Sequence, residues 1–179
     1  MSDNRQSHKN SPLTIVVVNK YYWNMAGKIQ QEIKQKKPIR LMEEEVTLNL
    51  ARTTDLLTQR FGDILKPLGI SPTQYNVLRI LRGAGSDGVN CKDIGSRMLT
   101  RDPDITRMMD RLEQRGLIMR DRAKEDRRVV IHKLTPEGLE LTNSLDEPLD
   151  SLHQQVMKHM SRGKLRELIG LLEELREGL

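Results

Sequence analysis

The amino-acid sequence predicts a mainly α-helical chain with one small β-hairpin, an α+β architecture. Over most of the chain, hydrophobic residues recur every three or four positions, as on the buried side of amphipathic helices. Residues 117–134 instead form two short runs rich in branched side chains around a polar turn, which is typical of a β-hairpin. Basic side chains occupy both the helix before this hairpin and the turn inside it. Together these observations predict a winged helix-turn-helix DNA-binding domain with additional helices at both ends.

Composition and charge point to a polyanionic partner. The chain has 179 residues, enough for one domain with extensions, and its balance of 31% charged and 36% hydrophobic residues argues against a membrane span. Residues 1–40 carry eight basic and two acidic groups, whereas 137–179 carry five basic and nine acidic ones. Such a separation of charge favours a nucleic-acid binder. Cys91 is the only cysteine, so no intramolecular disulfide can form and a cytoplasmic protein is expected.

Residues 1–38 are interpreted as an N-terminal extension, partly disordered or folded as an added helix. The polar residues 1–14 show no hydrophobic pattern and are expected to be disordered. The following apolar residues have helical spacing and predict a helix that packs on a dimer partner: Tyr22, Met25, Ile29 and Ile33. In the alternative interpretation, translation starts at Met25 and the preceding residues are an upstream extension.

Two helices are predicted before the helix-turn-helix. The first covers 39–68, and its apolar side is formed by Leu50, Thr54, Leu57, Phe61, Ile64 and Leu68. A helix of ~28 residues is ~42 Å long, which exceeds the needs of a small winged-helix core and leaves surface for a partner subunit. The second covers 71–83, with Ser71 as its N-cap and Pro72 in its first turn. Asn90 is the expected N-cap of the next, shorter helix.

That short helix, over 91–98, and a second helix over 103–115 form the predicted helix-turn-helix. For the second helix, Asp102 is the expected N-cap, Pro103 the first residue and Gly116 the stop. Its apolar side consists of Ile105, Met108, Met109 and Leu112. Its opposite side carries groups able to contact phosphates and base edges: Arg107, Asp110, Arg111 and Gln114.

The hairpin is predicted to be the wing of this domain. Its strands cover Leu117–Arg122 and Arg128–Leu134, and a charged turn joins them. In such a domain the second helix enters a DNA major groove, and the tip of the wing reaches the neighbouring minor groove or the backbone. Between Arg97 and Lys133, eleven basic residues outnumber seven acidic ones. This region is therefore the expected functional centre.

Further helices are expected after the wing. Thr135 is a predicted N-cap followed by Pro136 at the first helical position, and Pro148 is expected to kink or interrupt this helix. Ser161 separates it from a last helix with an apolar stripe formed by Leu165, Leu168, Ile169, Leu172 and Leu175. The terminal helices carry more apolar surface than one small domain covers, which favours a homodimer.

Three motifs in this order resemble the MarR family of bacterial transcriptional regulators. Asp110-Arg-Leu-Glu113 with Gly116-Leu117 is similar to the D-R-L-E-x-x-G-L pattern that ends the family's recognition helix. Asp126 and Arg128 match the D-x-R of its wing, and Leu134-Thr135 with Gly138 matches the following L-T-x-x-G. The resemblance runs from about residue 39 to the C-terminus and does not cover the N-terminal extension.

The resemblance implies a domain over 39–179, with a winged helix-turn-helix core at about 71–135 and dimerisation helices at about 39–68 and 136–177. It implies a homodimer that binds a pseudo-palindromic operator in double-stranded DNA, most often as a repressor. It also implies a possible effector, a small aromatic or phenolic anion. We expect its cleft between the 39–68 helix, the 71–83 helix and the helix after Thr135.

Eleven residues are candidates for DNA contacts. They are Arg101, Thr106, Arg107, Arg111 and Gln114 on or beside the recognition helix, Arg122, Lys124, Arg127 and Arg128 at the wing, and Thr73 and Gln74 at the start of the 71–83 helix. Arg128 is also expected to help hold the shape of the wing together with Asp126.

Other interpretations are weaker. No Gly-rich phosphate loop, nucleophile elbow or ligand-spaced His/Cys set is present, so we expect no enzyme activity, no cofactor and no metal. Cys91 is expected to be a small core residue, with a redox sensor as the alternative. Arg111 and Arg115 have a purely structural alternative, which is pairing with nearby acids such as Asp110 and Glu113 or lining a solvated face. The alternative function is a winged helix used only for protein–protein assembly.

Overall fold

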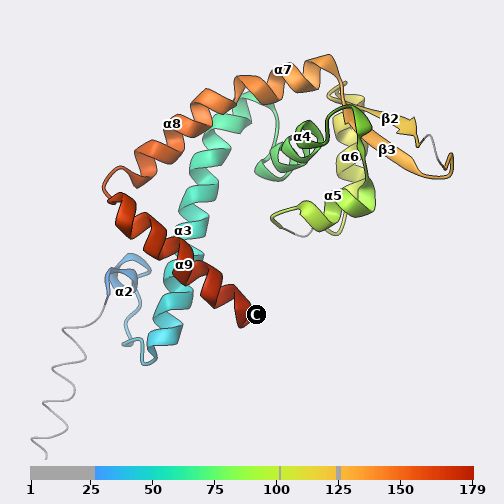
Figure 1. Cartoon of the computed structure of the whole chain (residues 1–179). Helices are drawn as coiled ribbons and strands as arrows, with labels where there is room; N and C mark the ends of the chain where they lie inside the picture. Colours follow the sequence, from blue (N-terminus) through green and yellow to red (C-terminus); the bar gives the residue numbers. More distant parts are fainter. Residues whose placement is uncertain (1–26, 101, 124–125) are drawn as a thin grey trace, which may run out of the picture. The chain divides into compact units, whose positions relative to one another are not determined.

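The computed structural model describes residues 27–100, 102–123 and 126–179 of the chain. The chain divides into two compact units, 1–57 and 58–179, with the boundary inside the long helix α3 (Met42–Leu65) (Figure 1). The tail predicted at 1–14 and the start of the added helix, including Tyr22 and Met25, lie outside the described residues.

Among the described residues of the first unit, the predicted N-terminal helix includes the short α2 (Lys28–Glu32), which buries Ile29. Three glutamates in the first turn of α3 favour its start, since negative charge is stabilised at a helix N-terminus. The predicted 39–68 helix begins later, at Met42, and its α-helical part ends earlier, at Leu65. The chain continues as the 3-10 turn η1 (Lys66–Leu68), because Pro67 has no N–H to continue the α-helical bonding pattern.

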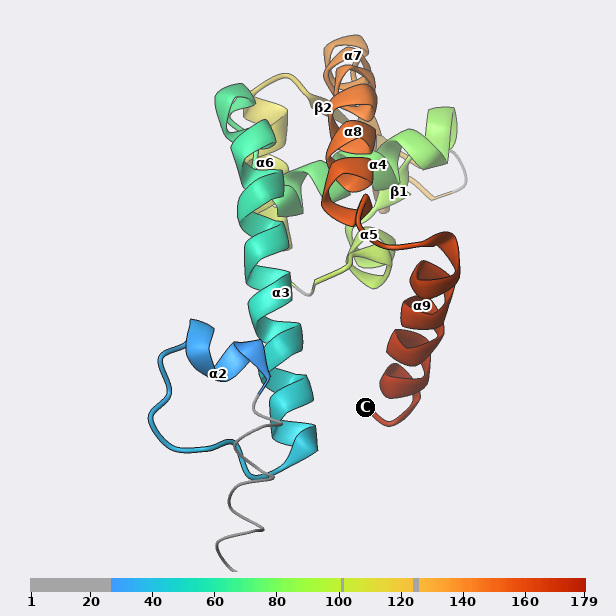
Figure 2. The same ribbon diagram turned by 90° about the vertical axis from the view of Figure 1, so that its left-hand side faces the viewer.

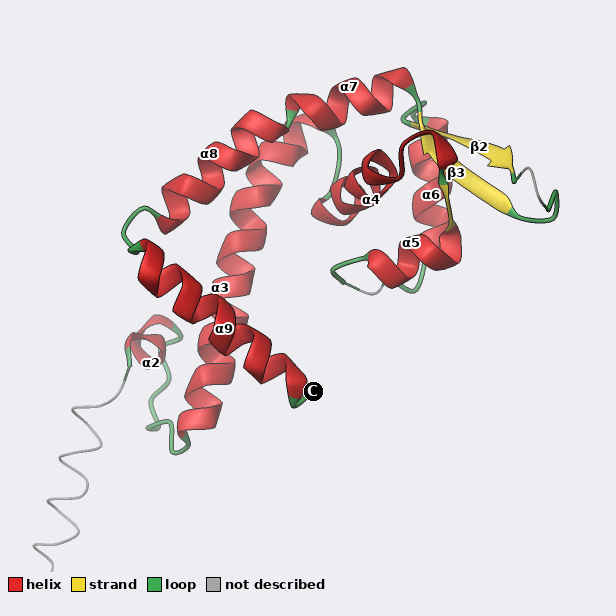
Figure 3. Ribbon diagram, viewed as in Figure 1, coloured by secondary structure: helices red, strands yellow, loops and turns green. Residues whose placement is uncertain are grey.

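The second unit is mainly helical with one small sheet (Figure 3). After η1 its elements are α4 (Pro72–Ala84), η2 (Gly85–Asp87), β1 (Val89–Asn90), α5 (Cys91–Arg97), α6 (Ile105–Gln114), β2 (Ile118–Arg122), β3 (Val130–Leu134), α7 (Pro136–Ser144), α8 (Asp146–Met157) and α9 (Arg162–Glu177). One core joins the end of α3 with α4, β1, α5, α6, the β2–β3 hairpin, α7 and α8, and its most buried members include Leu65, Leu78, Leu81, Ile94, Met109, Leu112 and Ile118. The predicted apolar side of the recognition helix therefore does face a core.

The sheet has three antiparallel strands in the order β1-β3-β2. The sequence predicts the hairpin of β2 and β3, but it does not predict β1. Two residues are too few to show strand periodicity, and only pairing with β3 makes them a strand. His132 lies at the centre of this sheet, opposite Val89 on β1 and Arg120 on β2, and is only 3% exposed.

Most predicted helix starts are confirmed. Ser71 and Gln74 form a capping box, in which the Ser71 hydroxyl accepts from the Gln74 amide (3.1 Å) and the Gln74 side chain accepts from the Ser71 amide (2.9 Å). Asn90, Thr135 and Ser161 each accept a hydrogen bond from a backbone amide of the first turn that follows.

The predicted start of the recognition helix is wrong by two residues. Helix α6 begins at Ile105, and its N-cap position is Asp104 rather than Asp102. The Asp102 carboxylate accepts a hydrogen bond from the Asp104 amide (2.8 Å), a local turn that competes with helix capping. Pro103 therefore lies in a turn before the helix, while Gly116, at φ 68°, follows the helix as predicted.

Helix α6, the wing and α7 are joined through one glycine contact. The Thr135 hydroxyl donates to the Gly116 carbonyl (2.6 Å), and the Thr135 amide donates to the Leu117 carbonyl (3.2 Å). A Cβ at Gly138, in the first turn of α7, would lie 1.9 Å from the Leu117 carbonyl oxygen. The L-T-x-x-G motif thus has a physical basis, because only glycine permits this close approach of two backbones.

The C-terminal region is divided as expected at Ser161, and earlier at Leu145 between α7 and α8. Pro148 lies in the first turn of α8, where its missing N–H removes no helical hydrogen bond. Helix α9 has no buried residue within this chain, and four of its hydrophobic side chains are exposed: Leu168, Ile169, Leu171 and Leu175. Within the described part of the chain, no helix is long and apolar enough to span a membrane.

Candidate nucleic-acid interface

Helix α6 has one buried side and one exposed side. Met108, Met109 and Leu112 are buried in the core, so the opposite side of the helix faces solvent. Figure 2 shows α6 in the turned view, next to the elements of the same unit. The exposed side includes four of the residues predicted from the sequence: Thr106, Arg107, Arg111 and Gln114. The fold therefore presents these side chains together on one surface.

The guanidinium groups on this surface have few intramolecular partners. Arg107 Nε lies 3.3 Å from Asp104 Oδ2, but the two side chains are 69% and 55% exposed. Ion pairs this exposed contribute little to stability and are readily exchanged. Arg111 has no acidic partner within salt-bridge distance among the described residues. Both side chains are thus available for an external anion.

The acids of α6 are occupied by Arg120, a residue of strand β2. Its guanidinium pairs with the Asp110 carboxylate and, through Nε, with Glu113 Oε2 at 3.0 Å. The hydrogen bond that Arg120 donates to the Asp110 carboxylate raises the pKa of Arg120 above its ordinary value. The pairing of these acids with Arg111 and Arg115, one part of the structural alternative, is therefore wrong, whereas a solvated position of Arg111 stays open.

Arg115 instead has a structural role. Its guanidinium donates to the carbonyl oxygens of Leu68 (2.8 Å) and Gly69 (2.5 Å), at the turn before α4. It thereby ties the end of α6 to η1. Sequence spacing gave no signal for this contact or for that of Arg120, because each joins elements that are separate in the chain.

A groove of about 290 Å³ lies between the start of α4 and the start of α6. It brings together four of the candidate residues from two helices: Thr73, Gln74, Arg107 and Arg111. The side-chain amide oxygen of Gln74, Oε1, already accepts the capping-box hydrogen bond from the Ser71 amide. Asp102 and Asp104 also line the groove, so its charge is mixed.

In the wing, the polar residues around the turn mainly hold its shape. The Asp126 carboxylate accepts from the Arg128 amide (2.9 Å), so the D-x-R motif acts here through the backbone of Arg128. Arg122 Nη1 donates to the Arg127 carbonyl (2.9 Å) across the hairpin. The guanidinium groups of Arg127 and Arg128 form no ion pair with a described residue. Arg101 and Lys124, two further candidates, lie outside the described residues.

Cys91 packs against the core and touches His132. Its sulfur lies 3.9 Å from both ring nitrogens of His132, whose Nδ1 is also 3.4 Å from the Val89 carbonyl oxygen. Burial raises the pKa of the Cys91 thiol, which disfavours the reactive thiolate. Burial lowers the pKa of His132 and favours its neutral form. The described residues contain no cluster of three or more metal-ligating side chains.

A separate cavity of about 430 Å³ lies between the end of α3, α4 and α8. Phe61, Leu65 and Leu149 supply apolar walls, and Tyr75 and Arg79 line it from α4. The Arg79 guanidinium is 6.0 Å from the centre of the Tyr75 ring and has no salt bridge with a described acid.

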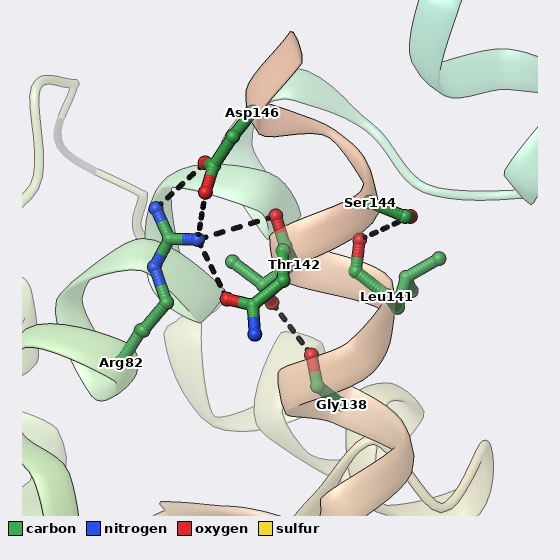
Figure 4. A network of polar contacts seen from close by, with 7 residues as sticks. Arg82, Gly138, Leu141, Thr142, Ser144 and Asp146 are labelled. Carbon is green, nitrogen blue, oxygen red and sulfur yellow. Dashed lines mark hydrogen bonds and ion pairs between the residues drawn. The ribbon is translucent and has the colours of Figure 1, made fainter. Parts of the chain in front are cut away.

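Arg82 also lines this cavity but is fully engaged (Figure 4). Its guanidinium donates to both carboxylate oxygens of Asp146, each at 2.9 Å, and to Asn143 Oδ1 at 3.0 Å. The hydrogen bond from Arg82 holds the pKa of Asp146 below its ordinary value. This network ties α4 to the junction of α7 and α8, so Arg79 is the arginine of this cavity that forms no ion pair within the described chain.

Comparisons with known proteins decide what kind of domain this is. The model of the MarR family matches residues 70–130. The multiple antibiotic resistance protein MarR of Salmonella typhimurium is 35% identical over 116 residues, which are 64% of this chain and 78% of that protein. The chain belongs to the MarR family of winged-helix transcriptional regulators. This is a family of regulators and not of enzymes, as the sequence predicted.

Two further similar proteins are informative. The homoprotocatechuate degradative operon repressor of Escherichia coli is 27% identical over 133 residues, covering 74% of this chain and 88% of that protein. A solved structure of mutant E. coli MarR complexed with operator DNA has 26% identity and a TM-score of 0.65, covering 76% of this chain and 99% of that chain. The mainly helical MarR fold with its three-stranded wing sheet confirms the predicted fold class.

Proposed function

We propose that this MarR-family protein is a homodimer that binds an operator in double-stranded DNA and represses transcription until a small anion releases it. Each subunit places α6 in a major groove and the wing against the adjacent minor groove or backbone. The observation that carries this proposal is the exposed surface of α6, where Arg107 and Arg111 have no strong partner among the described residues. The operator complex of the related E. coli protein supports it.

The proposed contacts are those predicted from the sequence, with Arg101 and Lys124 assigned from the sequence alone. Arg107, Arg111 and Gln114 contact base edges and phosphates, with Thr106 beside them. The remaining contacts are assigned to the backbone or minor groove: Thr73, Gln74, Arg101, Arg122, Lys124, Arg127 and Arg128. Of these, Arg122 and Gln74 are the weakest candidates, because both already support local structure.

The proposed dimer would use helices at both ends of the 39–179 domain, with 1–38 as an extension. Exposed hydrophobic residues on α9 support this arrangement, and so do Met42 (71% exposed) and Val46 (45% exposed) on α3 in the first unit. Apolar side chains grouped in this way on helices are better explained by a subunit interface than by solvent. A homodimer also matches the two-fold symmetry of a pseudo-palindromic operator.

The proposed effector is a small aromatic or phenolic anion in the cavity between α3, α4 and α8. Arg79 is available to pair with a carboxylate or phenolate, and Phe61 and Leu149 offer apolar surface to a ring. An anion bound there releases the protein from DNA only if it favours a dimer conformation in which the two recognition helices no longer match the two half-sites.

The proposal is tested by titrating labelled duplex from the protein's own promoter region at several salt concentrations, with random DNA as competitor. We expect tight binding that survives the competitor and weakens steeply with salt, because phosphate contacts release counterions. Arg107→Ala should weaken operator binding by roughly 1–3 kcal/mol, and Arg127→Ala should reduce the slope of log K against log salt by about one.

Neither variant should lower the melting temperature, since neither guanidinium forms a strong contact within the described chain. If both variants bind like the parent, the assignment of this surface is wrong. Equal binding to promoter and random DNA would contradict a sequence-specific regulator.

A further inference from the structure

The DNA-facing side of α6 is not purely cationic. Asp110 lies three residues after Arg107 and four before Gln114, so it shares their side of the helix. Glu113 lies next to it, toward strand β2, and both carboxylates are partly exposed, at 44% and 38%. Left unpaired, these carboxylates would repel phosphate and compete with DNA for the neighbouring arginines.

Arg120, a residue of another element, pairs with both of these carboxylates. It lies on β2, the strand that follows α6, and its single guanidinium pairs with both Asp110 and Glu113. The planar guanidinium has five donors in a fixed fork, so it can satisfy two carboxylates at once, which one ammonium does poorly. In the sheet, Arg120 lies opposite the buried His132, and this pairing fixes its strand position.

We propose that Arg120 is a positioning residue for DNA recognition: it binds Asp110 and Glu113 and so keeps both carboxylates away from DNA phosphates and from Arg107 and Arg111. The inference rests on the proposed function, since it assumes that α6 contacts DNA. Arg120 itself need not touch DNA. Its effect is to remove two negative charges from a helix that must approach a polyanion.

This role predicts a difference between stability and affinity. All three side chains are more than a third exposed, so the ion pairs add little to folding stability. The same carboxylates would act on phosphates brought close to them, where like charges are costly and sensitive to salt. Loss of Arg120 should therefore weaken operator binding far more than it lowers the melting temperature.

The test compares Arg120→Gln with the triple variant Arg120→Gln, Asp110→Asn, Glu113→Gln, both titrated against labelled promoter duplex at low and high salt. We expect Arg120→Gln to bind about tenfold more weakly at low salt, with a smaller deficit at high salt. The triple variant should return to within about threefold of the parent, because the unpaired charges are gone. Arg120→Lys should lie between parent and Arg120→Gln.

Recovery in the triple variant is the result that a merely structural ion pair, or a direct contact of Arg120 with DNA, would not give. A triple variant as weak as Arg120→Gln would overturn the proposal. So would a strong loss of binding in the variant with only Asp110→Asn and Glu113→Gln, because it would mean that the carboxylates themselves read bases.

Arg107→Ala measured beside these variants separates the two proposals. If the parent binds the promoter and Arg107→Ala is weak while the triple variant does not recover, only the role of Arg120 fails. If the parent does not bind DNA at all, the proposed function fails and this inference fails with it.

Discussion

At the scale of single residues, Gly138 has no side chain, and this allows the first turn of α7 to pack directly against the backbone between α6 and the wing. Its backbone lies against the Leu117 carbonyl, where a Cβ would approach to 1.9 Å. The Thr135 hydroxyl and amide hold the same junction through the Gly116 and Leu117 carbonyls. The family motif around Gly138 therefore reports a packing requirement and not a DNA contact.

Gly138→Ala should lower the free energy of unfolding by about 1–3 kcal/mol, as expected when a methyl group is forced into a packed site. Gly83→Ala is the matched control, because Gly83 is an exposed residue of α4 with no atom within 4 Å of an added Cβ. That control should be neutral or stabilise by up to about 1 kcal/mol. Denaturant unfolding of both variants checks the pair, and equal stability of the two would contradict the account of this junction.

His132 makes a second prediction at this scale. Its pKa in the folded protein is lowered from 6.5, mainly by burial. At a pH between the two pKa values of His132, the unfolded chain binds a proton on this residue and the folded chain does not. The contribution of His132 to stability is therefore full above about pH 6.5 and is lost as the pH is lowered. The slope from one such proton is at most about 1.4 kcal/mol per pH unit.

We therefore expect the free energy of unfolding to fall between pH 7 and pH 5, and this loss to be smaller in His132→Leu. The exposed His159, changed to Gln, provides the control and should leave the pH dependence as in the parent. Denaturant titrations at several pH values measure it. An unchanged pH dependence in His132→Leu would show that other groups are responsible.

Residue-scale predictions from the sequence succeeded where one element determines the outcome. The spacing of Met108, Met109 and Leu112 correctly predicted which side of α6 is buried, and hence which residues are exposed. The partners of Arg115 and Arg120 were missed because they lie on other elements, which no local pattern indicates. The DNA contacts of the exposed residues stay predictions.

At the scale of elements, the wing and the helix starts show the same limit. The branched residues of the hairpin predict it, whereas the two-residue β1 exists only through pairing with β3. Three predicted caps, Ser71, Asn90 and Thr135, are confirmed. The Asp102 carboxylate instead accepts a hydrogen bond from the Asp104 amide, and α6 starts at Ile105. A capping residue inferred from sequence thus fails when its side chain finds a nearer backbone amide.

At the scale of the whole molecule, the exposed apolar residues of α9 and the exposed arginines of α6 are the basis of the proposed assembly. In the proposal a second subunit covers the first set and DNA contacts the second. A two-fold dimer would present two copies of α6, with half-site centres roughly one helical turn, ~34 Å, apart. In this proposal, the two-fold interface between the subunits sets the distance between the two copies of α6, and hence the spacing of the half-sites on the operator.

A methylation-protection footprint of the promoter region with the purified protein tests the proposed dimer geometry on DNA. Guanine N7 lies in the major groove, so it reports the position of α6. We predict two protected major-groove patches whose centres are about one helical turn apart or a small multiple of it, both lost in Arg107→Ala. A single patch, or protection confined to the minor groove, would contradict the account.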